Sequence, residues 1–319
     1  MLPVVAMIYE SRCGETTWQL DHPKTLTPGI RMKPRDVALA AVPPALWAIA
    51  YTVAKPTMQS FPPLFLMSIV YGITAIALYR PNPKRQTPFW VILVGSALGG
   101  SVQSGLIFSG IALVPASTAV MTVQSQVPFA VLAAWAIGFE QINRGRLAGI
   151  ALSLGGVALV VGLPNSVSEI RGLLMIVAGT LCWGVAQAIV RAKSKEAGGY
   201  LMGAMSALAA PQMLAMSLLF ETGQRQALVN AGLANWGALL VLAVGGFVIA
   251  YTVWYGLLRT YRVDQVAPFI LLMPIIGVLL AFLFLNERPS ALVLCGGVII
   301  LAGLGLVVRA PRETVFQTA

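Results

Sequence analysis

The sequence predicts an all-α membrane protein in which ten transmembrane helices form two inverted five-helix repeats. The first observation behind this prediction is composition, because the 319 residues are 58% apolar and only 10% charged. About a quarter of the residues in a soluble domain are charged, so lipid must solvate much of this surface. The other two observations are a duplication within the chain and an uneven distribution of basic residues among the loops.

The duplication can be read without gaps. When Glu140 is set on Glu287, later residues coincide as well: Gly149 with Gly296, Gly156 with Gly303, and Val160-Val161 with Val307-Val308. An earlier stretch repeats at a second constant spacing, which sets Arg35, Trp47 and Lys55 on Arg171, Trp183 and Arg191. Duplicated halves made almost wholly of apolar helices are typical of secondary transporters.

Each element is predicted from an apolar run of membrane-spanning length bounded by polar residues. The ten predicted spans are residues 37–53, 63–79, 89–113, 117–138, 147–162, 172–190, 200–220, 236–258, 266–285 and 291–308. These spans divide the chain into a tail (1–35), a first repeat (36–162), a second repeat (171–308) and a second tail (309–319).

The basic residues predict the orientation. The two tails and every second loop hold 17 of the 21 Lys and Arg residues, and the opposite loops hold only Lys55, Arg171, Arg225 and Arg288. Cytoplasmic loops attract Lys and Arg, so both termini are expected in the cytoplasm. Because each repeat has an odd number of helices, the second repeat enters from the opposite side, which makes alternating access possible.

Composition also excludes several classes of protein. The net charge of +10 comes from short loops between apolar blocks rather than from a nucleic-acid-binding face. His22 is the only histidine, and the three cysteines are scattered without metal-ligand or disulfide spacing. The apolar run at residues 2–8 is too short for a signal-peptide core. We therefore expect no metal, no cofactor and no nucleic acid partner.

The chain resembles the drug/metabolite transporter superfamily, specifically its EamA-type members. Each repeat begins with a Trp-containing helix that ends in a basic residue, and each ends with an acidic loop and a glycine-rich helix. Four sequence segments resemble those of bacterial exporters of cysteine-type metabolites and, less closely, of aromatic amino acids: FPPLFL at 61–66, VQSQV at 123–127, RLAGIAL at 146–152 and RVDQVAPFILLMPIIG at 262–277. Gln141 departs from the Glu-Arg pair that the pattern expects after Glu140. The resemblance implies an inner-membrane exporter of amino acids or related metabolites.

No Asp, Glu, Lys, Arg or His lies in the middle of a predicted span. This absence argues against phosphate-bearing cargo and leaves no evident proton carrier, so facilitated diffusion of a neutral or zwitterionic cargo is expected. The remaining polar and aromatic residues form the predicted substrate site: Trp47, Tyr51, Gln103, Gln124, Trp183, Gln187, Tyr251 and Tyr255. Glutamine in hydrocarbon needs partners, so these side chains are expected to point inward.

Each of these residues also has a structural interpretation. A membrane glutamine can simply tie helices together, and Trp or Tyr near a span end can anchor at the interface. The repeated glycines are expected to permit close helix packing, and Glu140 and Glu287 to cap helices or pair with loops. Four prolines are predicted to kink helices at the site or gate: Pro44, Pro128, Pro268 and Pro274.

The sequence therefore predicts an exporter of neutral amino acids, including hydrophobic and aromatic ones, in the bacterial inner membrane. It is expected to act as a monomer or weak dimer in the lipid bilayer. A carrier of another uncharged metabolite or a drug-like cation is the nearest alternative. A membrane receptor or structural protein is a more distant one. An enzyme is not expected, because no nucleophile–base pair, carboxylate pair or metal set lies at membrane depth.

Overall fold

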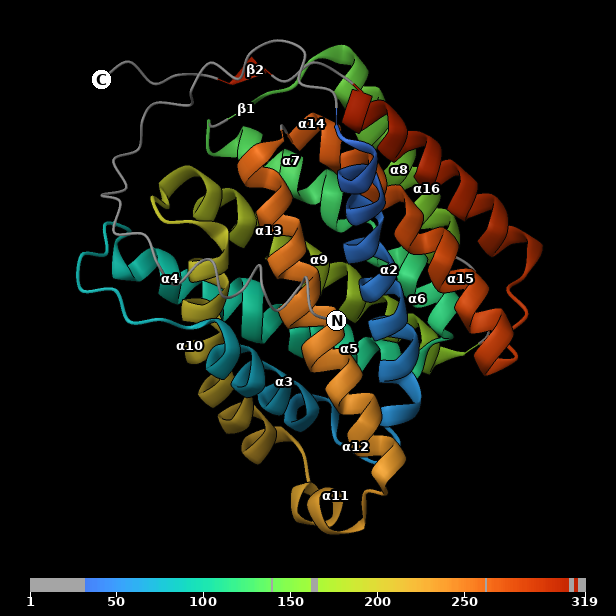
Figure 1. Ribbon diagram of the computed structural model, residues 1–319. Helices are drawn as coiled ribbons and strands as arrows, with labels where there is room; N and C mark the ends of the chain where they lie inside the picture. The colour runs from blue at the N-terminus through green and yellow to red at the C-terminus, as the bar shows by residue number, and fades with distance from the viewer. Residues whose placement is uncertain (1–31, 139, 162–165, 262, 310–312, 315–319) are drawn as a thin grey trace. The chain divides into compact units, whose positions relative to one another are not determined.

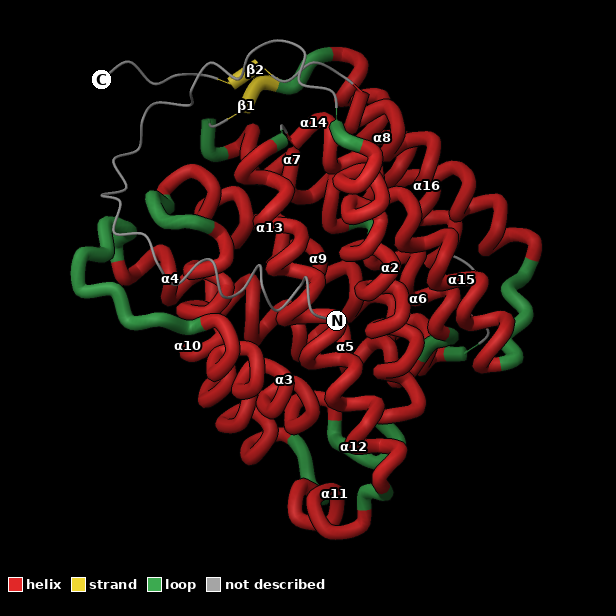
Figure 2. The backbone as a smooth tube through the Cα atoms, in the orientation of Figure 1, coloured by secondary structure: helices red, strands yellow, loops and turns green. Residues whose placement is uncertain are grey.

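The computed structural model describes residues 32–138, 140–161, 166–261, 263–309 and 313–314. Helices make up nearly all of this part of the chain (Figure 2). Its segments are apolar on every side, and a helix satisfies its own backbone groups away from water.

Figure 1 shows the elements in chain order. In the first half they are α2 (Pro34–Thr57), α3 (Pro63–Leu78), α4 (Phe89–Ser96), η2 (Ala97–Val102), α5 (Gln103–Leu113), α6 (Ala116–Val123), α7 (Gln126–Ala136), β1 (Glu140–Gln141) and α8 (Arg144–Val161). In the second half they are α9 (Val167–Lys193), α10 (Gly198–Phe220), α11 (Gln224–Asn230), α12 (Leu233–Leu240), η3 (Val241–Ile249), α13 (Ala250–Thr260), α14 (Val263–Val266), η4 (Ala267–Leu271), α15 (Leu272–Leu285), α16 (Ala291–Arg309) and β2 (Glu313–Thr314).

Nine helical stretches within the described residues are long and apolar enough to cross a membrane. A helix also forms at the tenth predicted position, but α3 has only 16 residues. At 1.5 Å per residue such a helix is about 24 Å long, shorter than the ~30 Å hydrocarbon core. The fold is therefore that of a multi-pass membrane protein, and the tenth crossing stays a prediction.

Helix interruptions fall at matching places in the two halves. The π-helical segment η2 continues α4 into α5, and the π-helical segment η3 continues α12 into α13. The displacement from Glu140 to Glu287, 147 residues, carries all of η2 onto the second part of η3. The same displacement carries Gln124, where α6 ends, onto Leu271, where the 3-10 helix η4 ends.

Three of the four prolines that were predicted to kink helices lie beside these interruptions. Pro128 lies in the first turn of α7, Pro268 lies in η4, and Pro274 lies in the first turn of α15, so each is next to a break. Pro44 differs from these three because α2 runs without a break from Pro34 to Thr57, and its kink stays a prediction. Packing against η3, α13 and α15 holds α2 helical despite the missing backbone donor.

Small residues set the closest helix contacts. The helices α8 and α16 lie side by side in Figure 1, and a Cβ atom on Gly149 would come within 2.7 Å of the Gly303 carbonyl oxygen. A Cβ atom on Gly156 would come within 2.9 Å of the Gly296 carbonyl oxygen. The predicted packing role of these four glycines is confirmed, because any side chain there would force the helices apart.

Two carboxylates cap helices from elsewhere in the chain. Glu287 accepts hydrogen bonds from the backbone N–H groups of Ala116 and Ser117 at 2.7 and 2.9 Å, at the start of α6. Glu221 accepts from the backbone N–H groups of Leu64 and Phe65 in the first turn of α3. Free N–H groups and the helix dipole both favour an anion there. The predicted capping role of Glu287 is thus confirmed.

Two small elements were not predicted. The two-residue strands β1 and β2 pair antiparallel, with Glu140 opposite Thr314 and Gln141 opposite Glu313. This pair corrects the all-α prediction only locally, and it ties the loop after α7 to the segment after α16. The short helix α11 fills the longer loop between α10 and α12, where the sequence analysis placed no element.

Candidate functional site

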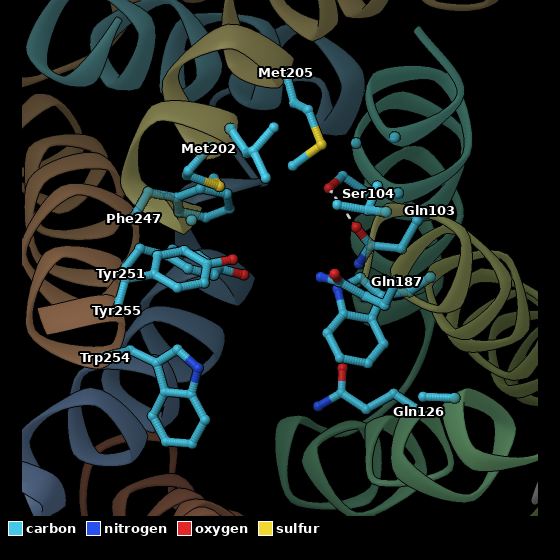
Figure 3. Close-up of a pocket in the computed structure, with 18 of the residues that line it drawn as sticks. Gln103, Ser104, Gln126, Gln187, Met202, Met205, Phe247, Tyr251, Trp254 and Tyr255 are labelled. Atoms are coloured by element: carbon cyan, nitrogen blue, oxygen red, sulfur yellow. Dashed lines mark hydrogen bonds between the residues drawn. The ribbon is translucent and has the colours of Figure 1, made fainter. Parts of the chain in front are cut away.

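A cavity of about 490 Å³ lies among the helices of both halves. Its lining comes from α2, α3, α4, α5 and α7 of the first half, from α9, α10, α13 and α15 of the second, and from η2, η3 and η4. This volume is within the range of small-molecule sites, which are mostly apolar with a few placed polar groups. Figure 3 shows two walls of different chemistry across the open space.

The aromatic wall consists of Trp47 from α2, Phe247 from η3, and Tyr251, Trp254 and Tyr255 from α13. The Trp47 ring meets Tyr251 edge-on at a centroid distance of 5.4 Å and Trp254 at 5.7 Å. Tyr251 stacks on Tyr255 at 5.9 Å and lies 6.0 Å from Phe247. Because Phe247, Tyr251 and Tyr255 are four residues apart, one helical face presents all three rings.

The amide wall faces it and carries polar side chains on three helices: Gln103 and Ser104 on α5, Gln126 on α7 and Gln187 on α9 (Figure 3). The Ser104 hydroxyl donates to the Gln103 Oε1 atom at 3.1 Å and lies 2.7 Å from the Tyr71 hydroxyl of α3. Two methionines of α10, Met202 and Met205, also line the cavity. The cavity thus offers hydrogen bonds on one side and ring faces on the other.

Most of the predicted substrate residues meet here. Seven of the eight line the cavity: Trp47, Tyr51, Gln103, Trp183, Gln187, Tyr251 and Tyr255. Tyr51 is stacked on Phe108 at a centroid distance of 5.8 Å. The structure thus brings together residues that lie more than 200 positions apart in the sequence.

Gln124 does not line the cavity, and its predicted position there is wrong. Its side chain is 0% exposed, and neither amide atom has a hydrogen-bond partner among the described residues. The reason is the break between α6 and α7, where Gln124, Ser125 and Val127 make backbone bonds to residues three positions earlier. This tightening rotates the following residues, so Gln126 rather than Gln124 reaches the cavity.

Several other lining residues were not predicted from the sequence. Phe247 extends the four-residue spacing of Tyr251 and Tyr255, a signal that was present in the sequence. Met202 and Met205 share a helical face, but methionine in an apolar helix carries no distinctive signal. Tyr71 lies near the middle of α3 between two other polar residues, Ser68 and Thr74, and only the structure shows its contact with Ser104.

The cavity reaches one loop end of the molecule. Its lining there includes Arg191 near the end of α9 and Glu196 before α10. The Glu196 carboxylate accepts from the backbone N–H groups of Gln86 and Thr87, at 2.5 and 3.0 Å, which ties two loops together. These are the only Asp, Glu, Lys, Arg or His side chains among the described lining residues.

The described lining stops short of the opposite end, where Lys55 lies. Lys55, which the repeat sets on Arg191, donates its ammonium group to the carbonyl oxygen of Val114 at the end of α5. Neither Lys55 nor Glu287 lines the main cavity, and Val114 and Glu287 border a separate pocket of about 210 Å³. Among the described residues, the lining therefore reaches the Arg191 end and not the Lys55 end.

One hydrogen bond outside the apolar spans fastens α2 to the end of α13. The Tyr261 hydroxyl donates to the Asp36 carboxylate at 2.5 Å, and this bond raises the pKa of Tyr261 because it favours the neutral phenol. No group of three or more His, Cys, Asp or Glu side chains that could hold a metal occurs in the described part of the chain.

Relatives of known name match nearly the full length. The chain is 27% identical over 283 residues to a Salmonella typhimurium protein named "Probable amino-acid metabolite efflux pump", covering 86% of this chain and 94% of that protein. It is 24% identical to a "Probable terminal-alkyne amino-acid exporter" of Streptantibioticus cattleyicolor, covering 83% and 93%. One solved crystal structure shares the fold, with a TM-score of 0.58 at 18% identity over 86% of this chain and 96% of that chain.

The family comparison matches the chain twice. The EamA-like transporter family matches residues 36–162 and again residues 170–309, so each half carries its own copy of the family pattern. This is the family to which the sequence resemblance pointed, and its two matches together cover most of the chain. The protein belongs to the EamA-like transporter family.

Proposed function

We propose that this protein exports neutral amino acids, including hydrophobic and aromatic ones, and related metabolites. The observation that carries the proposal is the cavity of about 490 Å³ between an aromatic wall and an amide wall. A zwitterion with an apolar side chain matches this pairing, because ring faces accommodate the side chain and amides bond the backbone groups. The names of the amino-acid efflux pumps and exporter among its relatives agree with this cargo class.

Transport proceeds by alternating access between two inverted five-helix repeats. Support comes from the two family matches, from the matching interruptions at η2 and η3, and from the pairing of α8 with α16 and of α3 with α10. In this scheme α3 is the tenth crossing, and a tilted or locally thinned bilayer accommodates its shorter length. Lys55 belongs to the closed end and Arg191, at the matching position, to the open end.

Cargo moves by facilitated diffusion. Proton-driven transport of cargo against its gradient needs an ionisable side chain that both sides of the membrane can reach. The only Asp, Glu, Lys, Arg or His side chains among the described lining residues, Arg191 and Glu196, lie at the loop end rather than between the two walls. A drug-like cation is the second candidate cargo, because five aromatic rings on one wall suit cation–π binding.

The protein acts in the bacterial inner membrane with both termini in the cytoplasm, as a monomer or weak dimer. The basic loops motivate this orientation. Reporter fusions after Arg85 and at Ala319 should both give cytoplasmic signals. A periplasmic signal from either fusion would refute the orientation.

The transport experiment uses purified protein in proteoliposomes and a panel of labelled amino acids, each tested with and without an imposed pH difference. Neutral amino acids with apolar side chains should equilibrate fastest, at rates that the pH difference leaves unchanged. Uptake of organic cations alone would favour the second candidate. Proton-driven accumulation above equilibrium would refute facilitated diffusion.

A further inference from the structure

A chain of buried hydrogen bonds leads from α3 to the cavity. It joins the Tyr71 hydroxyl to the Ser104 hydroxyl at 2.7 Å and the Ser104 hydroxyl to the Gln103 Oε1 atom at 3.1 Å. The three side chains are 4%, 1% and 7% exposed, respectively. All three line the cavity, and Figure 3 shows Gln103 and Ser104 side by side on the amide wall.

The donor and the acceptor of each of these hydrogen bonds follow from counting the protons on the two hydroxyl groups. Each hydroxyl has one proton, and the Ser104 proton is directed to the Gln103 Oε1 atom. Tyr71 is then the donor to Ser104, because its other acceptor, the Gly100 carbonyl oxygen, is 3.4 Å away. One lone pair of the Gln103 oxygen is therefore occupied, and the NH₂ group keeps both of its protons for the cavity.

That NH₂ group makes no contact that holds the fold together among the described residues. Its nitrogen has no hydrogen-bond partner among the described residues. Both amide atoms of Gln124 are fully buried without a partner, whereas the Gln103 nitrogen does not belong to that group of atoms. Gln212 gives the contrast, because its Oε1 accepts from Ser101 at 2.7 Å and its Nε2 donates to Ser96 at 3.2 Å. Gln212 uses both ends of its amide to bridge helices and does not line the cavity.

We propose that Tyr71 and Ser104 are positioning residues that lock Gln103 as a hydrogen-bond donor to the carboxylate of the cargo. A fixed donor in an apolar cavity favours an anionic acceptor, and a charge-assisted bond is about twice as strong as a neutral one. Gln103 thereby selects amino acids over their carboxamides, while the aromatic wall receives the side chain. This inference rests on the proposed amino-acid transport and specifies which group selects the cargo.

The test compares two probes with the same side chain. L-phenylalanine and L-phenylalaninamide are offered to proteoliposomes, and the ratio of their kcat/KM values is measured. L-methionine and L-methioninamide replace them if the wild type moves methionine faster. The Gln103→Glu variant keeps the size but sets an acceptor against the carboxylate, so the ratio should fall by roughly 10- to 150-fold, the scale of one hydrogen bond to a charged group.

The positioning residues need a separate readout. Tyr71→Phe and Ser104→Ala free the Gln103 amide to rotate, so the KM for the amino acid should rise a few fold while the KM for its carboxamide stays constant. Ser104→Thr retains a hydroxyl, so its ratio of kcat/KM for the amino acid to kcat/KM for the carboxamide should equal that of the wild type. Tyr79→Phe removes a hydroxyl just beyond α3, outside the cavity, and is the matched control.

An unchanged ratio in a Gln103→Glu variant that reconstitutes normally would overturn the inference. If that variant does not fold, unchanged KM values in Tyr71→Phe and Ser104→Ala would overturn it instead. A wild type that moves neither the amino acids nor their carboxamides refutes the proposed function itself. A wild type that moves the amino acids with a ratio insensitive to all three variants refutes only the role of Gln103.

Discussion

The segments η2–α5 and η3–α13 share a backbone pattern and differ in chemistry. Each passes from a π-helical stretch into an α-helix, and the 147-residue displacement sets Gly100 on Phe247 and Ser104 on Tyr251. All four residues line the cavity, but the first segment contributes to the amide wall and the second to the aromatic wall. Duplication therefore fixes where side chains point, and later substitution fixes what each wall can bind.

The helices α2 and α9 also carry side chains at matching positions that differ in chemistry. Trp47 and Trp183 occupy matching positions and both line the cavity. One turn further along, Tyr51 on α2 matches Gln187 on α9, so the polar group again belongs to the amide wall. A cargo with an apolar end and a zwitterionic end suits this asymmetry better than a symmetric one would.

The largest effect is expected on the aromatic wall. Tyr251→Ala removes a ring that contacts Trp47, Phe247 and Tyr255. Tyr251 is partly buried, so loss of its ring should cost less than the ~3–5 kcal/mol of a fully buried aromatic ring, and we expect a lower thermal midpoint and a kcat/KM for uptake lowered by at least about thirtyfold. Tyr251→Phe keeps the ring and should retain most activity. Equal damage from both variants would show that the hydroxyl, not the ring, matters.

A smaller effect is expected at Gln187 of the amide wall and at Trp183, which lines the cavity from the same helix. Gln187→Ala and Trp183→Ala should each weaken apparent cargo affinity by about five- to thirtyfold, which corresponds to one hydrogen bond or stacking contact of ~1–2 kcal/mol. Membrane abundance should stay at the wild-type level. Leu181→Ala, on the exposed side of the same helix, is the control. Normal transport by both variants would assign these residues to helix packing.

The smallest effect on transport is expected from Gln124. Its amide is buried without a partner among the described residues, so Gln124→Met should raise the free energy of unfolding by about 1–3 kcal/mol. The thermal midpoint should rise by a few degrees while uptake stays unchanged. A well-folded variant that no longer transports would return Gln124 to the substrate site.

The sequence predicted the helices well because apolar runs of this length have few alternatives in lipid. Repeat equivalence also predicted Trp47 with Trp183 and Tyr51 with Gln187, because duplicated helices keep their orientation. Gln124 was misplaced because helical periodicity assumes an unbroken helix, and the break at α6–α7 is a tertiary feature.

Other features could not be predicted for similar reasons. The bond between Tyr71 and Ser104 joins different helices, and no local pattern encodes that distance. The capping role of Glu287 was predicted, but its partner α6 was not, because the two lie 171 positions apart in the chain. The strands β1 and β2 are each only two residues long, too short to leave a periodicity of two in the sequence.

Protection of a single cysteine tests most directly whether cargo occupies the space between the two walls. Ala130 lines the cavity, so Ala130→Cys is made in a chain whose Cys13, Cys182 and Cys295 are replaced by Ser. The rate of modification by a small methanethiosulfonate reagent is then measured with and without saturating L-phenylalanine. Val229→Cys, on the exposed helix α11, is the control that cargo should not affect. Our account predicts that L-phenylalanine slows modification at position 130 several fold and leaves position 229 unchanged. Equal rates at position 130 with and without cargo, in protein that still transports it, would contradict the account.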